Sequence, residues 1–299
     1  MKNLLTFLIL IFLSCSALSQ TVPSSALLEV QLKNKLHQLV KNSDAVTGVA
    51  VIDLQTGAQL ELNADIEFPQ ASAIKIPILM EVYKQAAEGK FSLSDPLKVG
   101  SENLVGGTGI LSQLEDGPAL SIRDLGILMI ALSDNSATNA LIDLVGMGNI
   151  NSTLRSLGLE HTMVRRKMIN AAASARGEEN ISTPMEAARI LQLLYEGKFV
   201  DKVTSEAILE VLKKNDRGGS RIAARIPSEV PIAFKPGGIP GVSTEWTLVL
   251  LPERPYAIAV MESYKTPGTS DKAMEQISEL VYRYFWKLGK ASGYGTYVR

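Results

Sequence analysis

Cysteine and histidine are scarce in this sequence, whose 299 residues include one cysteine, Cys15, and two histidines, His37 and His161. A lone cysteine cannot close a disulfide within the chain, and no second thiol is present to bind a metal or to act as a nucleophile. Neither histidine lies in a spaced cluster of carboxylates or imidazoles. We therefore expect no metal and no cofactor, and a stability that rests on packing.

An excess of charge of one sign is also missing. The chain has 30 Lys and Arg against 31 Asp and Glu, which gives a formal net charge of -1, and like charges form no long run. This balance provides no electrostatic footprint for nucleic acid and no polybasic arm for a membrane surface. We expect a monomer that acts on a small-molecule substrate.

The N-terminus has an apolar run, but a short one. Residues 4–13 follow Met-Lys-Asn and are too few to span a bilayer, whereas their length suits the core of a signal peptide. Ala17 and Ser19 are small residues at the spacing that signal peptidase prefers, so we expect residues 1–19 to be removed on export to the periplasm or the medium. The alternative is a lipoprotein signal in which Cys15 becomes the lipidated N-terminus.

Apolar periodicity divides the rest of the chain into three parts. Both ends contain a helical pattern and strand-like runs, at 26–41, 45–53 and 58–63 and then at 230–234, 244–251, 256–262 and 270–288. The middle, 72–224, contains helical stretches broken by Gly and Pro.

This order predicts an α+β fold in which both ends of the chain build one antiparallel sheet, flanked by the terminal helices, with an all-helical lobe inserted between them. The expected boundaries are 20–68 with 225–299 for the α/β lobe, and 69–224 for the helical lobe.

A serine and a lysine three residues apart, Ser72 and Lys75, stand at the expected start of a buried helix. At this spacing their side chains share one helical face. A serine hydroxyl is a poor nucleophile until a base removes its proton, and a lysine that is desolvated among apolar neighbours can have a pKa low enough to do so. The pair therefore predicts a serine nucleophile, although Ser-x-x-Lys also occurs by chance.

Two further motifs follow along the chain. Ser133-Asp134-Asn135 lies in the helical region, and this tripeptide is rarer by chance than Ser-x-x-Lys. Lys235-Pro236-Gly237-Gly238 ends one predicted strand and precedes another. Other Lys-x-Gly triplets occur at Lys98 and Lys287, so it is the position between two strands that favours Lys235.

The three motifs, in this order and with these gaps, resemble the signature of class A β-lactamases and their penicillin-binding relatives. Segments 71–78, 132–139, 182–184 and 239–242 are also similar to family segments, so the resemblance spans most of the chain after the expected signal peptide. It implies the same fold that the periodicity predicts.

The resemblance also implies roles for single residues. Ser72 attacks the lactam carbonyl with Lys75 as the base, and Ser133 passes a proton to the leaving nitrogen. Asn135 holds the side-chain amide of the substrate, and Lys235 attracts its carboxylate. The backbone N–H groups of Ser72 and Gly238, the latter directly after Gly237, form the oxyanion hole.

The chain departs from the family pattern in the omega loop before Ser182. Family members carry there a glutamate that activates the water for deacylation, with an asparagine four residues later. Asn170 matches the asparagine, but Arg166 or Lys167 stands where the glutamate belongs. Glu178 or Glu179 is a substitute if the loop folds differently, although a solvated acidic pair is the simpler interpretation.

A second departure is Pro236, because the family has a hydroxyl residue there that helps to bind the carboxylate of the substrate. Glu245 replaces a basic residue often found on the next strand, and Lys265 or Arg221 is a candidate to compensate.

Three functions follow. The leading one is a serine β-lactamase-like hydrolase that works through a Ser72 acyl-enzyme. The second is a D-alanyl peptidase or esterase of the penicillin-binding-protein type, and the third is a sensor that β-lactams acylate without turnover.

Overall fold

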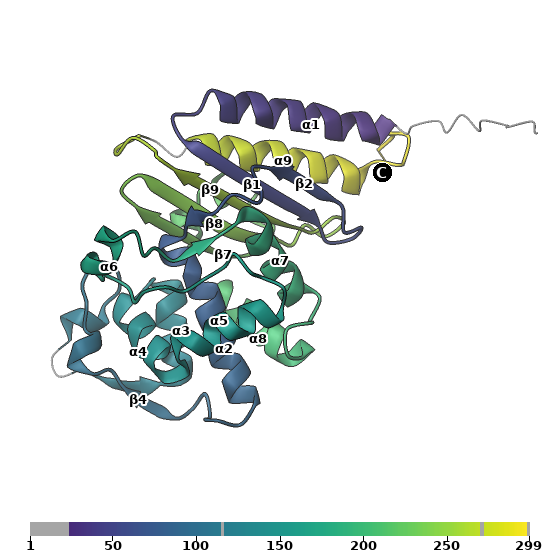
Figure 1. Ribbon diagram of the computed structural model, residues 1–299. Helices are drawn as coiled ribbons and strands as arrows, with labels where there is room; N and C mark the ends of the chain where they lie inside the picture. The colour runs from purple at the N-terminus through teal and green to yellow at the C-terminus, as the bar shows by residue number, and fades with distance from the viewer. Residues whose placement is uncertain (1–23, 115–116, 270–271, 298–299) are drawn as a thin grey trace, which may run out of the picture.

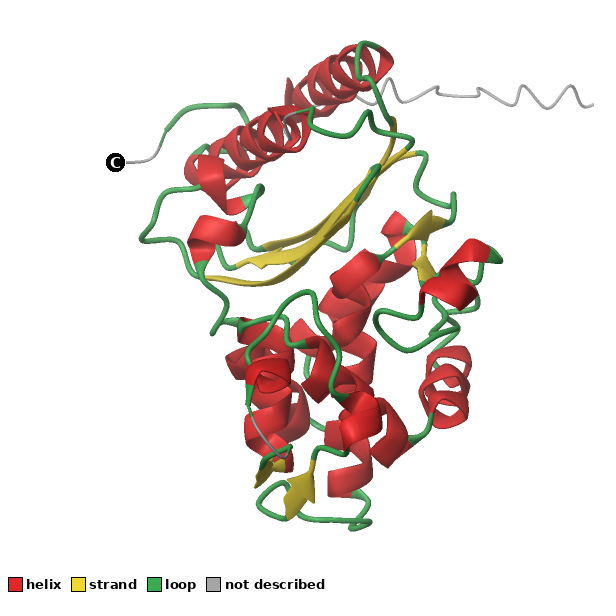
Figure 2. Cartoon of the chain, turned by 90° about the vertical axis from the view of Figure 1, so that its left-hand side faces the viewer, coloured by secondary structure: helices red, strands yellow, loops and turns green. Residues whose placement is uncertain are grey.

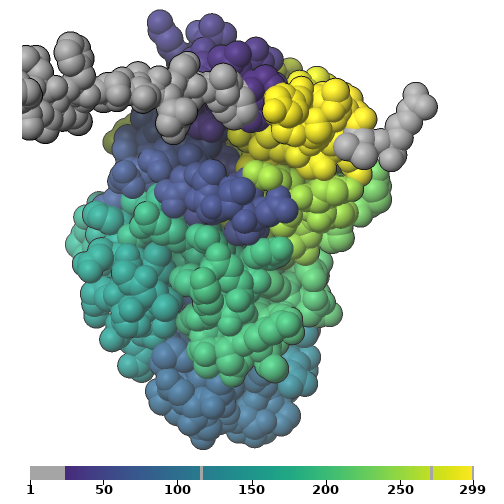
Figure 3. All heavy atoms as spheres, turned by 90° about the vertical axis from the view of Figure 1, so that its right-hand side faces the viewer, coloured from purple at the N-terminus to yellow at the C-terminus, as the bar shows by residue number. Residues whose placement is uncertain are grey.

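The computed structural model describes residues 24–114, 117–269 and 272–297. The expected signal peptide, 1–19, and Cys15 lie outside these ranges. In the described part, the two ends of the chain lie together at one pole, and residues near 90–120 form the opposite pole (Figure 3).

A five-stranded antiparallel sheet contains strands from both ends of the chain, as predicted. Its order is β2-β1-β9-β8-β7, with bounds β1 Val46–Asp53, β2 Gln59–Leu62, β7 Ile232–Ile239, β8 Val242–Val249 and β9 Tyr256–Ser263. The central contact joins β1 to β9, and Val49 lies opposite Val260. Short turns link β1 to β2, β7 to β8 and β8 to β9, so these pairs are antiparallel, and the β1–β9 pair is antiparallel as well.

The two terminal helices, α1 Ser24–Lys41 and α9 Lys272–Lys290, cover one face of this sheet side by side (Figure 1). Successive side chains of β9 point to opposite faces of the sheet, and both faces are buried. Ile258 and Val260 pack with the terminal helices, whereas Ala259 packs with the helical region on the other face. Tyr256, at the start of β9, stacks on Phe285 of α9 with ring centroids 4.3 Å apart.

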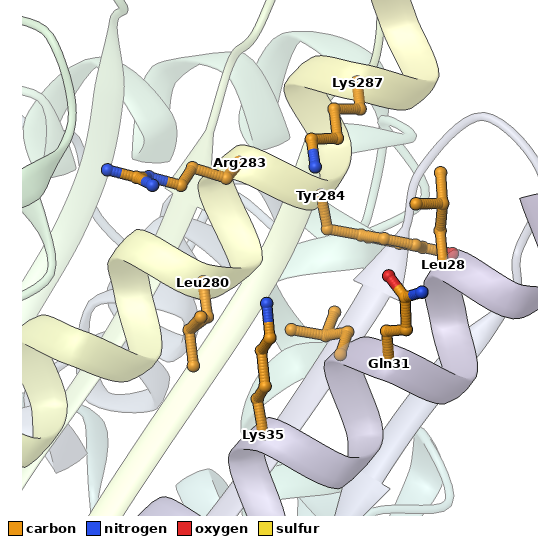
Figure 4. Close-up of a pocket in the computed structure, with 8 residues that line it drawn as sticks. Leu28, Gln31, Lys35, Leu280, Arg283, Tyr284 and Lys287 are labelled. Carbon is orange, nitrogen blue, oxygen red and sulfur yellow. The ribbon is translucent and has the colours of Figure 1, made fainter. Parts of the chain in front are cut away.

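A small cleft of about 120 Å³ lies between α1 and α9, where Lys35 and Lys287 reach toward each other across Tyr284 (Figure 4). Neither a serine nor a carboxylate lines it. Its walls belong to the helices on the outer face of the sheet.

Helices fill the space below the other face of the sheet (Figure 2). They are α2 Lys75–Ala87, α3 Ile122–Ala131, α4 Asn135–Val145, α5 Met147–Ser156, α6 Ala171–Ala175, α7 Pro184–Tyr195 and α8 Lys202–Leu212. The 3-10 turns are η1 Ala71–Ile74, η2 Ser101–Asn103, η3 Leu111–Gln113, η4 Arg217–Gly219 and η5 Ala223–Arg225. Two short strand pairs also lie here, β3 Phe68–Pro69 with β6 Ile181–Ser182, and β4 Pro96–Lys98 with β5 Ala119–Ser121.

The predicted α+β class is confirmed, and one local detail differs. Ser72 lies in the 3-10 turn η1, and the α-helix begins only at Lys75. Pro77 fits in the first turn of α2 because an N–H group at that position has no acceptor within the helix. The boundaries expected for the two lobes stay a prediction.

Candidate active site

The turn that carries Ser72 is held in an uncommon backbone conformation. Ala71 has φ +44°, a left-handed value that is rare for a residue with a side chain. Gln70, which precedes it, is fully buried, and its carbonyl accepts the N–H of Ala73 at 2.9 Å. The Ser72 side chain is half-buried and borders a cavity.

Lys75 is fully buried one turn after Ser72. Its Nζ donates to the carbonyl of Ser133 at 2.7 Å and to Oδ1 of Asn135 at 2.9 Å, and it lies 3.1 Å from Oγ of Ser133. Burial lowers the pKa of the Lys75 ammonium well below its usual value, the nearby charge of Lys235 lowers this pKa further, and Asp134 opposes the change. The predicted first and second motifs therefore meet in space.

The Ser133–Asn135 turn is fastened from both sides. Asp134 caps α4 by accepting the N–H of Ala137 at 2.9 Å, and its other oxygen accepts the N–H of Ile110 at 2.7 Å. Thr108 donates its hydroxyl to the carbonyl of Ser133 at 2.6 Å. These bonds hold the loop 106–109, which contains three glycines and Thr108, against the Ser133–Asn135 turn.

The third motif lies on β7, on the far side of the Ser72 turn. Lys235 is buried, and burial lowers its pKa to about 8 although the negative charge of Glu245 opposes this shift. A Cβ at Gly237 would lie 2.5 Å from the carbonyl oxygen of Gln70, so only glycine lets β7 lie this close to the turn. This contact places the next residue, Gly238, beside Ser72 at the cavity.

One cavity of about 590 Å³ connects these elements. It is lined by Ala71, Ser72, Gly107, Thr108, Asn135, Arg166, Met168, Ile169, Asn170, Ala171, Ser174, Gly238, Ile239 and Pro240. Among these lining residues Arg166 carries the one formal charge, and none is a carboxylate. The lining of the cavity is mostly apolar, which favours an uncharged acyl group there.

The segment before β6 forms one wall of the cavity, and Asn170 is among the residues that line it. The side-chain oxygen of Asn170 is already used, because it caps α6 by accepting the N–H of Ala173 at 3.0 Å. Arg166 also borders the cavity, and its guanidinium pairs with Glu179 at 2.6 Å. Ser174 donates a further hydrogen bond to Glu179.

Two further charged residues of this segment, Lys167 and Glu178, also form ion pairs. Lys167 pairs with Asp143 of α4 at 2.6 Å, and Glu178 pairs with Arg176 at 2.7 Å. Glu178 and Glu179, the two substitutes considered for the family glutamate, are each paired with an arginine, and neither is among the residues that line the cavity.

Sequence reasoning missed Met168, which lies in this wall. Asn139 of α4 fixes its backbone, because the amide oxygen accepts the N–H of Met168 at 2.8 Å and the amide nitrogen donates to its carbonyl at 3.3 Å. The Met168 side chain is nearly buried and borders the same cavity as Ser72. The signal in the sequence was Asn139, a buried amide four residues after Asn135 that needs polar partners.

A second cavity of about 440 Å³ adjoins the first at Gly238 and is lined by Arg221 and Lys265 among others. Glu245 is fully buried and accepts the backbone N–H of Arg221 at 2.9 Å, so it fixes the segment on which Arg221 stands. Arg221 and Lys265, the two candidates to compensate for the basic residue that Glu245 replaces, therefore lie next to the site.

The described residues contain no group of three or more His, Cys, Asp or Glu side chains suited to holding a metal ion. Across the same ranges, no helix combines the length and the apolar character that crossing a membrane requires.

The sequence matches the family model of the β-lactamase enzyme family over residues 31–285. β-Lactamase CTX-M-97 of Escherichia coli is 28% identical over 248 residues, which are 81% of this chain and 84% of that protein. The carbapenem-hydrolyzing β-lactamase KPC of Klebsiella oxytoca is 24% identical over 273 residues, or 90% and 92% of the two chains.

Solved structures match over similar lengths. PBP-A has a TM-score of 0.79 and 25% identity over 86% of this chain and 96% of its own. A β-lactamase of Sphaerobacter thermophilus has a TM-score of 0.75 and 27% identity, with coverage of 87% and 97%. A PBP-A variant solved as the acyl-enzyme complex with penicillin G has a TM-score of 0.78 and 26% identity, with coverage of 86% and 97%.

Proposed function

Since the chain belongs to the β-lactamase enzyme family, we propose that Ser72 is the nucleophile through which this serine hydrolase opens β-lactam rings. The family membership confirms the resemblance inferred from the motifs and the hydrolase class. The roles of single residues are our proposal. One observation carries it, namely that the buried Lys75 ammonium lies 3.1 Å or less from atoms of both Ser133 and Asn135 beside the cavity that Ser72 borders.

Acylation requires a proton to leave Ser72 as its oxygen attacks the lactam carbonyl. Lys75 suits this task because its lowered pKa provides a neutral amine at a pH where an exposed lysine is charged. The C–N bond of the ring then breaks, and Ser133, 3.1 Å from Lys75, delivers a proton to the leaving nitrogen. The product is an ester between Ser72 and the opened ring.

Binding is divided between the two sides of the cavity. The backbone N–H groups of Ser72 and Gly238 polarise the carbonyl and stabilise the oxyanion. Asn135 forms a hydrogen bond with the amide of the acyl chain, and Lys235 attracts the substrate carboxylate. Because Pro236 lacks a hydroxyl, Arg221 in the adjoining cavity is the second group that we assign to this carboxylate.

Release of the acyl group requires a base for water, and no carboxylate is among the residues that line the cavity. This observation favours a second candidate, an acyl-enzyme that persists. A persistent adduct with β-lactams is expected of a D-alanyl peptidase or esterase of the penicillin-binding-protein type, which turns over a different substrate. It is equally expected of a sensor that β-lactams acylate once.

Nitrocefin hydrolysis and time-resolved intact-mass spectrometry test these functions together. A β-lactamase turns nitrocefin over, and its mass adduct, located on Ser72, decays within minutes. A stable adduct without turnover supports the second candidate, and assays with stem peptides and p-nitrophenyl esters then separate a peptidase or esterase from a sensor. If neither turnover nor an adduct occurs, and Ser72→Ala behaves like the parent protein, the proposal is wrong.

We also propose that the chain is exported and acts as a monomer on a small-molecule substrate. Cleavage after Ser19 leaves Gln20 as the new N-terminus, whereas lipidation leaves a modified Cys15. Intact mass of the protein recovered from the producing cells distinguishes the two, and retention of residues 1–19 contradicts both.

A further inference from the structure

Gln70 is a fully buried glutamine placed directly before the turn of Ser72. Its side chain uses both ends of the amide. The oxygen accepts the indole N–H of Trp246 in β8 at 2.9 Å, and the nitrogen donates to the carbonyl of Phe68 in β3 at 2.8 Å. Because an indole N–H can only donate, Trp246 determines which end of the amide is the oxygen.

The backbone of Gln70 has polar partners as well. Its N–H donates to the carbonyl of Asn180 at 2.8 Å, and its carbonyl accepts the hydroxyl of Thr244 in β8 at 3.1 Å. One residue therefore ties the Ser72 turn to β8 of the central sheet, to β3 and to the end of the cavity wall.

This attachment controls a distance that matters for catalysis. The carbonyl oxygen of Gln70 lies so close to Gly237 that a Cβ there would be 2.5 Å from it. The N–H group of Gly238 belongs to the next residue of β7. The N–H group of Ser72 lies two residues after Gln70 on the other side. A shift of Gln70 therefore changes the gap between the two N–H groups that would bind the oxyanion.

We propose that Gln70, held by Trp246, is a positioning residue that sets the spacing of the oxyanion hole. This inference rests on the proposed role of Ser72. Gln70 does not touch the substrate, because it is fully buried behind the turn. Its contribution appears when the lactam carbonyl becomes tetrahedral, since the two N–H groups must converge on one oxygen at that moment.

The substitution Gln70→Met tests the proposal, because methionine has a similar length, offers Trp246 only a weak thioether acceptor and cannot donate to the carbonyl of Phe68. We expect the rate constant for acylation of Ser72 in single-turnover experiments to fall roughly 10- to 100-fold, which is less than the roughly 10²- to 10³-fold loss when an oxyanion-hole donor is removed outright. A boronic acid that forms a tetrahedral adduct with Ser72 should lose affinity in proportion. The dissociation constant of the noncovalent complex that precedes acylation should stay within about twofold of the parent value.

Gln85 of α2 provides a matched control. It is also a buried glutamine, and its amide nitrogen donates to Glu81 at 2.7 Å and to the carbonyl of Val145 at 2.8 Å, away from the cavity. Gln85→Met should lower the melting temperature and leave acylation unchanged. Gln70→Met combined with Trp246→Phe removes the weakly bonded indole N–H, so it should recover part of the melting temperature without recovering the rate.

The outcomes separate this inference from the proposed function. If the parent protein forms no adduct on Ser72, the proposed function fails first. If the parent protein is acylated and Gln70→Met acylates at the same rate, or if the two methionine variants lose rate equally, Gln70 is only a structural residue and the inference is wrong. Circular dichroism at the assay temperature ensures that each variant is folded.

Discussion

Two buried lysines, Lys75 and Lys235, shape the electrostatics around Ser72. Burial lowers the pKa of both, and the charge of Lys235 lowers the pKa of Lys75 further. The proposed mechanism uses them in opposite states, with Lys75 neutral as a base and Lys235 charged as an anchor for a carboxylate. The environment of the pair therefore separates two roles for one residue type.

The pH dependence of acylation follows from this difference. The rate should rise with pH as Lys75 loses its proton and fall above about pH 8, because the pKa of Lys235 is lowered to about 8. Stopped-flow acylation with a carboxylate-bearing β-lactam at a series of pH values measures both limbs.

Lys235→Arg is the control, since arginine stays charged over this range. Its descending limb should move to higher pH even if the maximal rate is lower. An unchanged descending limb in this variant would show that Lys235 is not the group that titrates.

Met168 is the second residue whose chemistry is testable alone. A carboxylate at this place would enter the cavity beside Ser72, where the lining has none. We expect Met168→Glu to speed the loss of the acyl group roughly 10- to 100-fold, because it supplies a general base whose placement is not optimised for the roughly 10²- to 10⁴-fold that a well-positioned base contributes. The measurement is the decay of the Ser72 adduct by intact mass.

Met168→Gln is the matched control, with a similar shape and no basic group. It should retain the slow decay of the parent protein. Equal decay in both variants would mean that water does not approach the ester from the side of Met168.

At the scale of elements, the segment 163–181 forms one wall of the cavity without regular structure over most of its length. It is pinned by three kinds of contact, namely the ion pair of Arg166 with Glu179, the backbone bonds from Asn139, and the side chain of Asn180, whose oxygen accepts two backbone N–H groups. Buried polar anchors of this kind substitute for a helix or a strand in holding a loop.

Arg166→Ala removes one of these anchors and leaves the part-buried Glu179 without its cation. We expect a loss of about 2 kcal/mol in the free energy of unfolding, typical of hydrogen bonds to charged groups, and faster amide hydrogen exchange over 163–181. Lys167→Ala removes the neighbouring, more exposed pair with Asp143 and should cost under about 1 kcal/mol. Equal losses in denaturant titrations would contradict the anchoring role of Arg166.

The whole molecule is organised around a sheet that is buried on both faces. The core below the sheet is continuous from Ala259 of β9 to the helices around Lys75, and the core above it joins β9 to α1 and α9. The site therefore rests on strands whose outer face is covered by the ends of the chain, and loss of the terminal helices would expose that face.

Phe285→Ala tests this coupling from a place remote from Ser72. Removal of a nearly buried ring stacked on Tyr256 should cost about 3–5 kcal/mol, and unfolding should stay a single transition in both far-UV circular dichroism and nitrocefin reactivity. Its neighbour Trp286 is 39% exposed, so Trp286→Ala should cost far less. Loss of reactivity well before loss of ellipticity would mean that the site melts independently of the sheet.

The sequence by itself determined the class of fold and the chemical groups of the site. Runs of apolar residues marked β8 and β9, and the spacing of Ser72 and Lys75 brought a hydroxyl and an amine onto one side of a turn. These features are local, because each depends on neighbours within one or two turns or on alternation along one strand. For the same reason the three motifs were recognisable before their meeting in space was visible.

Only the tertiary structure decided what surrounds those groups. Gln70 meets Trp246 across 176 positions of sequence. Met168 borders the cavity together with Arg166, without a carboxylate, and Asn139 fixes the backbone of Met168 there. The sequence pattern of a loop does not specify such contacts, because the loop has no period of its own and its conformation follows from distant polar partners. The burial that lowers the pKa of Lys75 is likewise a property of the packed molecule, since no local run of residues can exclude water from an ammonium group.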